Sequence, residues 1–213
     1  MTAQLYCFGE SGHSYKAALT LELSGYDWTP IFVDFFNGES RGDAYRNLNE
    51  MAEAPVFREG DLTLTQSAVI QLHIAEKTGK FLDGDRNEIL RWMFWDNHKL
   101  SAMIGTTRFL ENFLPEAKRP REVIDFQKAR LKGAYKVLDG HLQGRDWIAG
   151  GQPTIADFTC CGYLYYPEPF GFERTDWPHI NAWLERIATL PGWKHPYELM
   201  PGNPSDRAAK EEK

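Results

Sequence analysis

Hydroxyl side chains gather where the first predicted strand of this chain gives way to a helix. Tyr6 belongs to the strand, and Ser11, His13 and Ser14 follow in the loop. A thiol becomes a nucleophile only as the thiolate, and a hydroxyl donor beside a helix N-terminus can stabilise that anion with help from the helix dipole. These four residues are therefore candidates for activating a thiol. Serine is also a favoured N-cap, so Ser11 taken alone is better explained as a helix cap.

A second stretch whose residues could bind a ligand begins at Ala54-Pro55-Val56. It predicts a short apolar strand entered through a proline, a tight turn at 59–61, a second strand, and a helix that opens at Gln66-Ser67. Ser67 stands just before an apolar run of helical period, which predicts it as the N-cap. Because the first N–H groups of a helix are unpaired and partly positive, this helix start is suited to bind a carboxylate.

Both stretches fall in an N-terminal part that alternates strands and helices. The predicted elements are a buried strand at 4–8, a helix at 15–25, a strand at 28–36 dense enough in apolar residues to be covered on both faces, a short helix near 44–50, the hairpin, and a helix ending at 77–79. The order β-α-β-α-β-β-α, a parallel βαβ unit followed by a hairpin and a closing helix, is that of a thioredoxin-like domain.

The rest of the chain is predicted to be helical. Apolar residues recur at helical spacing over 87–114, 121–142 and 177–190, and prolines end the first and the last of these helices. A further helix begins at 153–157, where Thr154 and Asp157 form a capping box before an apolar run. We interpret this box as a folding device. The tail over 203–213 is charged and predicted to be loose.

Composition limits the classes of function. The chain has 213 residues, 42% hydrophobic and 25% charged, as expected of a globular protein. The net charge of −6 argues against a nucleic-acid partner, and no apolar run has the length of a membrane span. Three cysteines without a C-x-x-C motif predict neither a disulfide framework nor dithiol exchange, and the six histidines lack paired ligand spacing, so we expect no metal. With no signal peptide visible, the predicted location is cytoplasmic.

Taken together, these motifs resemble the cytosolic glutathione transferases, and specifically the bacterial, serine-type members nearest to the zeta, theta and beta-like classes. In that family a cis-proline precedes the third strand and a Glu/Gln-Ser pair opens the third helix, which are Pro55 and Gln66-Ser67 here. The first loop is most similar to the zeta pattern S-S-C-S-[WY]-[RK]. The resemblance makes Ser11 the favoured thiolate donor, Tyr6 the runner-up, and Ser14 a group that shares the donation.

The resemblance also implies how glutathione, as co-substrate, would bind. The backbone around Ala54, Pro55 and Val56 would pair with the cysteinyl part, and Gln66 with Ser67 would hold the γ-glutamyl carboxylate. A lysine often found three residues before the cis-proline is Ala52 here, so the glycyl contact is absent or comes from another residue, for which His13 and Asn49 are candidates. Gly12-His13 replaces the serine-cysteine of the zeta pattern, which weakens any transfer of its maleylacetoacetate isomerase activity.

The fold that this resemblance implies is an α/β thioredoxin-like N-terminal domain plus an all-α C-terminal helical domain. We expect the glutathione-binding domain at 1–80, a linker at 81–87, and at 88–213 a helical domain that contributes the electrophile pocket. The expected activity is attack of the glutathione thiolate on a small apolar electrophile, in a homodimer that serves detoxification. Alternatives are a glutathione-dependent isomerase, peroxidase, dehalogenase or ether-cleaving enzyme, and a non-catalytic glutathione-binding or scaffold protein.

Overall fold

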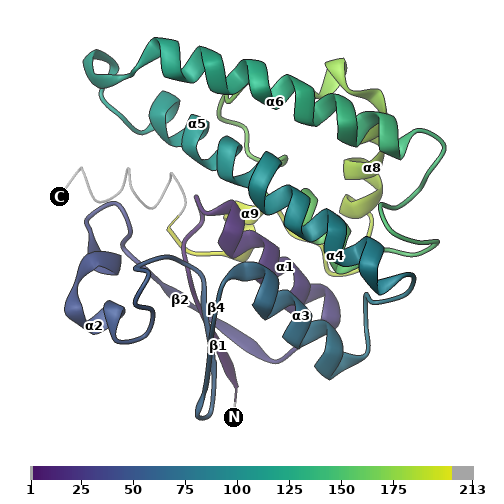
Figure 1. Cartoon of the computed structure of the whole chain (residues 1–213). Helices are drawn as coiled ribbons and strands as arrows, with labels where there is room; N and C mark the ends of the chain where they lie inside the picture. Colours follow the sequence, from purple (N-terminus) through teal and green to yellow (C-terminus); the bar gives the residue numbers. More distant parts are fainter. Residues whose placement is uncertain (1, 203–213) are drawn as a thin grey trace. The chain divides into compact units, whose positions relative to one another are not determined.

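The chain folds into two compact units, each with its own core. The computed structural model describes residues 2–202. One unit comprises Met1–Lys80 together with the chain from Pro191 onward, and the other is Phe81–Leu190. Figure 1 shows the sheet and helices of the first unit and the helices of the second.

The first unit contains a mixed sheet with helices. Its elements are β1 (Ala3–Cys7), α1 (Gly12–Ser24), β2 (Trp28–Phe32), a 3-10 turn at Glu39–Arg41, α2 (Asp43–Arg46), β3 (Val56–Glu59), β4 (Leu62–Thr65), α3 (Ser67–Thr78) and, from the end of the chain, α9 (Pro196–Leu199). The β-α-β-α-β-β-α order expected of a thioredoxin-like domain is confirmed.

The sheet has four strands in the order β2-β1-β3-β4. β1 pairs parallel to β2 and antiparallel to β3, and β3 pairs antiparallel to β4. β2 is therefore an edge strand that ends at Phe32, with Thr29 and Pro30 exposed. The prediction of a longer strand covered on both faces was wrong, because apolar density cannot distinguish a central strand from an edge strand, where a proline is tolerated.

The two faces of the sheet carry different neighbours. Phe57 contacts His73 of α3, with ring centroids 5.9 Å apart, so its face is the one that α3 covers. Side chains alternate along a strand, which sends the neighbouring Val56 to the opposite face. There Val56 packs with Val33, Tyr45 and the partly buried Tyr6. The first unit therefore has a second, smaller apolar cluster on the α2 side of its sheet.

Helices α1 and α3 pack against each other and are held by a buried polar contact (Figure 1). Gln71 Nε2 donates to Thr20 Oγ1 across 3.0 Å, and Thr20 Oγ1 donates to the backbone oxygen of Lys16 at 2.8 Å. α1 ends at Gly25, whose φ of 68° lies in the left-handed region that glycine adopts without strain. This pair of helices forms the framework on which the first turn of α1 stands.

The second unit is helical. Its elements are α4 (Arg86–Trp95), a π-helical turn (Asp96–Ser101), α5 (Ala102–Asn112), a 3-10 turn (Glu116–Lys118), α6 (Arg121–Leu142), α7 (Ile155–Cys160), a 3-10 turn (Arg174–Asp176) and α8 (Pro178–Ala188). The predicted helix at 87–114 is a helical run over 86–112, interrupted by the π turn, where Ser101 Oγ donates to the buried Asp96 carboxylate at 2.8 Å. All-α character is confirmed for this unit.

The capping box predicted at Thr154 and Asp157 is present at the start of α7. Asp157 is completely buried, and its carboxylate accepts hydrogen bonds from the backbone of Thr154 (2.8 Å) and Ile148 (2.9 Å) and from the indole of Trp183 (2.8 Å). One carboxylate thus joins three segments of the helical core. It has no exposed face, which supports its interpretation as a folding device.

The last described segment of the chain groups with the first unit. The sequence predicted a helical domain over 88–213, whereas the contacts place residues 191–202, including the short helix α9, with residues 2–80. Sequence analysis missed α9. The predicted loose tail at 203–213 lies outside the described residues. The linker at 81–87 stays a proposal.

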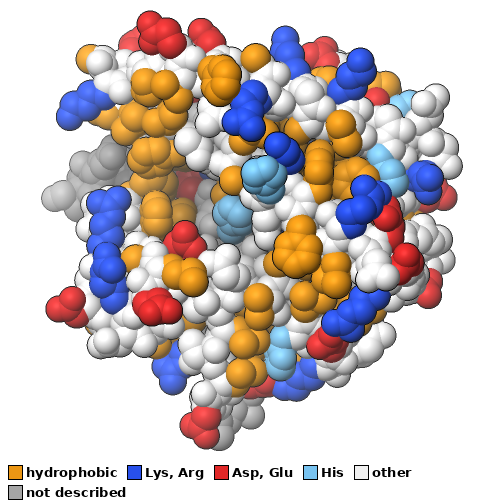
Figure 2. Space-filling view, in the orientation of Figure 1, with side chains coloured by type: hydrophobic (Ala, Val, Ile, Leu, Met, Phe, Trp, Pro, Cys, Tyr) orange, Lys and Arg blue, Asp and Glu red, His pale blue; other side chains and the backbone are white. Residues whose placement is uncertain are grey.

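Charges of both signs are interspersed on the surface face shown in Figure 2, with apolar side chains between them. Among residues 2–202, none of the helices combines the length and the apolar character that crossing a bilayer requires. The same residues contain no group of three or more histidine, cysteine, aspartate or glutamate side chains arranged to hold a metal ion.

Candidate active site

Ser11 lies at the N-terminus of α1, at the end of a tight turn. The turn spans Phe8 to Ser11 and is closed by a 3.0 Å hydrogen bond from Ser11 N to Phe8 O. Ser11 is the N-cap: its Oγ accepts from Ser14 N at 3.1 Å. This bond uses a lone pair of the hydroxyl oxygen, so the O–H remains able to donate to another group, and within the described chain it has no acceptor. The cap role and a donor role are therefore compatible.

The residues that follow Ser11 belong to the helix rather than to a loop. α1 begins at Gly12, three residues earlier than the predicted start at residue 15, because Ser11 supplies a cap that periodicity alone does not reveal. Ser14 is fully buried, and in the part of the chain that the structure describes its Oγ has no hydrogen-bond partner. A buried hydroxyl without a partner is uncommon, which keeps Ser14 among the candidate donors.

His13 also differs from its predicted environment. It was expected to be an exposed loop residue, but it lies in the first turn of α1 and is only partly exposed. Burial, with a smaller contribution from the nearby Lys16 charge, lowers the pKa of the His13 imidazole to about 3. His13 is therefore neutral at physiological pH and adds no positive charge to the site.

The side chain of Tyr6 lies on the face of the sheet opposite to the one that α3 covers. It packs against the small apolar cluster of Val33, Tyr45 and Val56, on the face opposite to that of Leu5 and Cys7. Its ring thus packs on the α2 side of the sheet, which agrees with its interpretation as a core residue.

The Ala54–Pro55 peptide bond is cis, as the resemblance implied. Val56 lies opposite both Tyr6 and Thr65, so on either side its backbone groups meet a neighbouring strand. Ala54 precedes the ladder and makes no hydrogen bond within the described residues, so its N–H and C=O are available to a ligand. Of this trio, Ala54 is the residue best able to pair with a bound peptide.

The chain that leads into the cis peptide is held by the side chains of Tyr45 and Asn49, a role that the sequence did not predict. Asn49 Nδ2 and Tyr45 Oη both donate to the backbone oxygen of Glu53, at 2.7 and 3.0 Å, and Asn49 Oδ1 accepts from Met51 N at 3.1 Å. Asn49, considered as a substitute glycyl contact, instead uses both of its polar groups within this turn. Asparagine is a common turn former, and that was the available signal.

Gln66 and Ser67 begin α3, with their roles shifted by one position. Gln66 is the N-cap and Ser67 the first helical residue, so the prediction of Ser67 as cap was wrong. Gln66 has a φ of 68° and a ψ of 117°, and its side chain donates to the exposed Glu53 carboxylate at 3.0 Å. The Ser67 side chain is buried to 5% exposure and makes no hydrogen bond within residues 2–202. The Ser67 hydroxyl and the first N–H groups of α3 can therefore donate hydrogen bonds to an anionic ligand.

Strand register brings these three segments to one end of the sheet. β1 runs into the Phe8–Ser11 turn, β3 emerges from Ala54–Pro55, and β4 runs into Gln66. The pairs Tyr6↔Val56 and Val56↔Thr65 align the last part of β1, the start of β3 and the end of β4. The N-termini of α1 and α3 and the unpaired backbone of Ala54 therefore meet at the same end of the sheet. This arrangement can bind an extended acidic peptide and place a thiol near a hydroxyl.

Comparison with known proteins agrees with this geometry. Residues 1–76 match the family model of the glutathione S-transferase N-terminal domain, and residues 100–191 match that of the C-terminal domain. Similar curated proteins include the disulfide-bond oxidoreductase YfcG of Escherichia coli K12, 26% identical over 211 residues (93% of this chain, 90% of YfcG), and glutathione S-transferase 4 of Zea mays, 27% identical over 208 residues (93% of each).

The similar solved structures are also glutathione S-transferases. A crystal structure of a possible glutathione S-transferase from Rhodopseudomonas palustris is 30% identical with a TM-score of 0.85, over 92% of this chain and 98% of that one. A glutathione S-transferase from Xanthobacter autotrophicus Py2 is 28% identical with a TM-score of 0.84, over 97% of this chain and all of that one. With both family domains matched and the fold shared along nearly its whole length, this chain belongs to the glutathione S-transferase family.

Proposed function

We propose that this chain is a serine-type glutathione transferase in which Ser11 stabilises the glutathione thiolate. The observation that carries the proposal is the convergence of the Ser11 turn, the Ala54–Pro55 peptide and the start of α3 at one end of the sheet. The cysteinyl part of glutathione pairs with the free backbone of Ala54. The γ-glutamyl carboxylate binds at Ser67 and the N-terminus of α3, with Gln66 beside it.

In the proposed reaction, the protein has only to stabilise the glutathione thiolate and hold it beside the electrophile. The glutathione thiol loses its proton to solvent, and the Ser11 O–H donates to the resulting thiolate beside the N-terminus of α1. The thiolate then attacks an electrophilic carbon: a C–S bond forms, and with chlorodinitrobenzene the C–Cl bond breaks and chloride leaves. A decrease of one unit in the pKa of the thiol corresponds to about 1.4 kcal/mol, which one hydroxyl and a helix end can supply.

The remaining features are proposed from the family alone. Members are typically homodimers that act on small apolar electrophiles in the cytoplasm, in detoxification, and we propose the same here. Cys7, Cys160 and Cys161 form no disulfide in the described residues, which agrees with a reducing compartment. The serine-type class, nearest to the zeta, theta and beta-like classes, is likewise proposed from the sequence pattern.

Substitution of Ser11 tests the catalytic assignment. We expect Ser11→Ala to lower kcat with chlorodinitrobenzene by at least about tenfold and to raise the pKa of the bound thiol, read from the ultraviolet absorbance of the thiolate, by roughly one unit. Calorimetry should show glutathione affinity nearly unchanged. Ser11→Thr, which keeps both hydroxyl and cap, should retain most turnover, and Tyr6→Phe should be close to wild type.

The alternatives give different results in the same experiments. Full turnover of Ser11→Ala with loss in Tyr6→Phe would transfer the role to Tyr6, and loss in Ser14→Ala alone would transfer it to Ser14. Retention on a glutathione resin without turnover of any electrophile or hydroperoxide would favour a binding or scaffold protein. Failure of the wild-type chain to bind glutathione would remove the proposal altogether.

Reduction of disulfides is a second candidate function, favoured by the similarity to YfcG. The chain's own cysteines are all buried, so such a reaction would have to use glutathione sulfur. A bound thiolate would attack a substrate disulfide, release one thiol and leave a mixed disulfide, and a second glutathione would resolve it to glutathione disulfide. Turnover of hydroxyethyl disulfide, coupled to glutathione reductase, tests this. Absence of turnover while chlorodinitrobenzene is consumed would exclude it.

A further inference from the structure

The turn that presents Ser11 is covered by the far end of the chain. Phe8 to Ser11 form a four-residue turn whose two central residues are Gly9 and Glu10. Both central residues are bound by the segment 191–202, which returns to the first unit after the helical unit is complete. Nothing in the local sequence of either stretch predicts this contact.

The contacts are polar and specific. Gly9 N donates to the backbone oxygen of Pro201 at 2.6 Å, and Tyr197 Oη donates to the Glu10 carboxylate at 2.8 Å. Glu10 is only 4% exposed, and a carboxylate so deeply buried needs hydrogen-bond donors to offset its lost hydration. Tyr197 supplies one of these donors. The two residues between Phe8 and Ser11 are therefore each held by a separate bond from the same segment.

The segment is itself firmly attached to the first unit. Tyr15 Oη donates to the backbone oxygen of Lys194 at 2.9 Å, and Lys194 Nζ pairs with Glu22 at 2.6 Å. Leu199 and Met200 are buried. At Gly202 the backbone passes so close to Phe32 that a Cβ atom would lie 2.2 Å from its ring. Because the segment is attached at several points, it can restrain the turn, and loss of any single anchor leaves the others in place.

We propose that Tyr197, acting through Glu10, is a positioning residue that holds the Ser11 hydroxyl in the orientation that stabilises the glutathione thiolate. This inference rests on the proposed function of Ser11. Tyr197 touches no reacting atom. It fixes the turn from outside, and it binds a negative charge adjacent in sequence to the site where the thiolate forms. Loss of its hydroxyl should therefore loosen the turn and disfavour the thiolate.

Hydrogen–deuterium exchange tests the structural half without requiring any activity. In Tyr197→Phe we expect the amides of Gly9 to Ser11 to exchange roughly tenfold faster than in wild type, because the turn loses a hydrogen bond to a charged acceptor, which is stronger than a bond between neutral groups. Tyr15→Phe is the matched control, because it removes the same group from another anchor of the same segment. It should leave exchange at the turn within about twofold of wild type.

Kinetics test the catalytic half. We expect Tyr197→Phe to lower kcat for chlorodinitrobenzene by about threefold to tenfold and to raise the pKa of the bound glutathione thiol, while KM for the electrophile stays near wild type. Glu10→Gln keeps an acceptor for the tyrosine and should retain slow exchange at the turn, whereas Glu10→Ala should reproduce the fast exchange of Tyr197→Phe.

The outcomes separate this inference from the proposed function. Unchanged exchange at Gly9 to Ser11 in Tyr197→Phe overturns the inference, whatever values kcat and the thiol pKa take in that variant. Fast exchange with unaltered kcat and thiol pKa in an active enzyme also overturns it, because the turn would then be held without consequence for Ser11. If wild type itself fails to bind glutathione, the proposed function fails, and the catalytic half of the inference fails with it.

Discussion

Gln66 is held in a backbone conformation that residues with a side chain rarely adopt. Its φ of 68° with a ψ of 117° lies outside the usual allowed regions, and such a residue costs on the order of 1–3 kcal/mol. The side chain is restrained by hydrogen bonds to the Glu53 carboxylate at 3.0 Å and to Met51 Sδ at 3.2 Å. Strain of this kind persists where the surroundings impose it, and here it accompanies a helix start proposed to bind glutathione.

Substitution by glycine should separate the strain from the binding role. We expect Gln66→Gly to raise the free energy of unfolding of the first unit by about 0.5–1 kcal/mol, because glycine tolerates a positive φ, and to weaken glutathione binding because the amide is lost. Denaturant unfolding and calorimetric titration measure the two effects. Gln66→Ala is the control: it should lose binding without any gain in stability. Equal stability of the two variants would contradict the strain argument.

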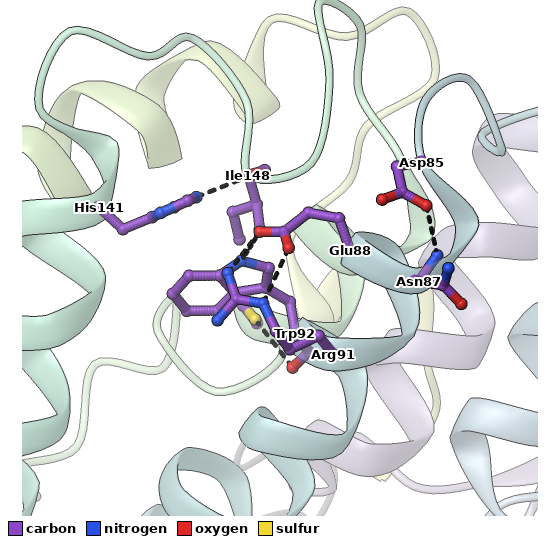
Figure 3. A network of polar contacts seen from close by, with 8 residues as sticks. Asp85, Asn87, Glu88, Arg91, Trp92, His141 and Ile148 are labelled. Atoms are coloured by element: carbon purple, nitrogen blue, oxygen red, sulfur yellow. Dashed lines mark hydrogen bonds and ion pairs between the residues drawn. The ribbon is translucent and has the colours of Figure 1, made fainter.

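At the scale of elements, α4 carries a polar network on its exposed side, drawn in Figure 3. Asp85 caps the helix by accepting from Asn87 N at 2.9 Å. Glu88 accepts from Arg91 Nε at 2.8 Å and from the indole of Trp92 at 2.9 Å. The His141 ring of α6 lies tilted against Trp92, with centroids 4.3 Å apart, and its Nε2 is 2.8 Å from the accepting oxygen of Ile148. One glutamate thus links the helix surface to an indole in the core of the helical unit.

The pH dependence of stability tests this network. The hydrogen bond from Arg91 lowers the pKa of Glu88 to about 2 from an ordinary 4.5. Because the unfolded chain binds the proton more readily, the stabilisation is fully present above pH 4.5 and is lost as the pH falls toward 2. We expect Glu88→Gln to destabilise the helical unit by about 1 kcal/mol at neutral pH, since solvent screens the exposed Arg91, and by progressively less below pH 4.5.

Tryptophan fluorescence during urea unfolding at several pH values measures this difference. Glu173→Gln, at an exposed glutamate whose side chain makes no ion pair within the described residues, is the matched control and should show no such trend. A destabilisation by Glu88→Gln that stayed constant from neutral to acidic pH would mean that packing on Trp92, rather than the charge, accounts for the effect.

At the scale of the whole molecule, the cysteines are distributed over both units and buried in each. Cys7 lies in β1, and Cys160 and Cys161 lie at the end of α7. Burial raises the pKa of the Cys7 thiol to about 12, so this group is protonated at neutral pH and a poor nucleophile. The prediction of Cys7 as a core residue agrees with this environment. The reactive sulfur of any thiol chemistry should therefore belong to glutathione.

Thiol titration tests that conclusion. We expect Ellman's reagent to leave the native chain unreacted on the time scale of minutes and to titrate three thiols after denaturation. A variant with Cys7, Cys160 and Cys161 replaced by alanine should keep both transferase and any disulfide-reducing turnover, provided that calorimetry shows it folded. Fast labelling of one thiol in the native chain, coupled to loss of turnover in the replaced variant, would instead assign the reaction to a protein cysteine.

Short-range signals in the sequence were sufficient for much of the site. A serine before a helix, a proline before a strand, and a threonine three residues before an aspartate each specify backbone geometry within a few residues. Ser11 accordingly caps α1, Thr154 and Asp157 form their box, and the element order follows from periodicity. The cis state of Pro55 was implied by family resemblance rather than by any local preference.

Pairing between segments distant in the sequence decided which residues of the candidate site lie together. Strand order and register determined that the Ser11 turn, Ala54 and Ser67 meet at one end of the sheet, that β2 is an edge strand, and that Tyr6 packs against the cluster of Val33, Tyr45 and Val56. Folding also brought the segment around Tyr197 back onto Glu10. The bonds between this segment and the turn join residues up to 192 positions apart, from Gly9 to Pro201. The sequence by itself therefore determined which groups are available and how each local backbone bends. Only the tertiary structure decided which of them meet, because pairing between distant segments depends on the packing of the whole unit.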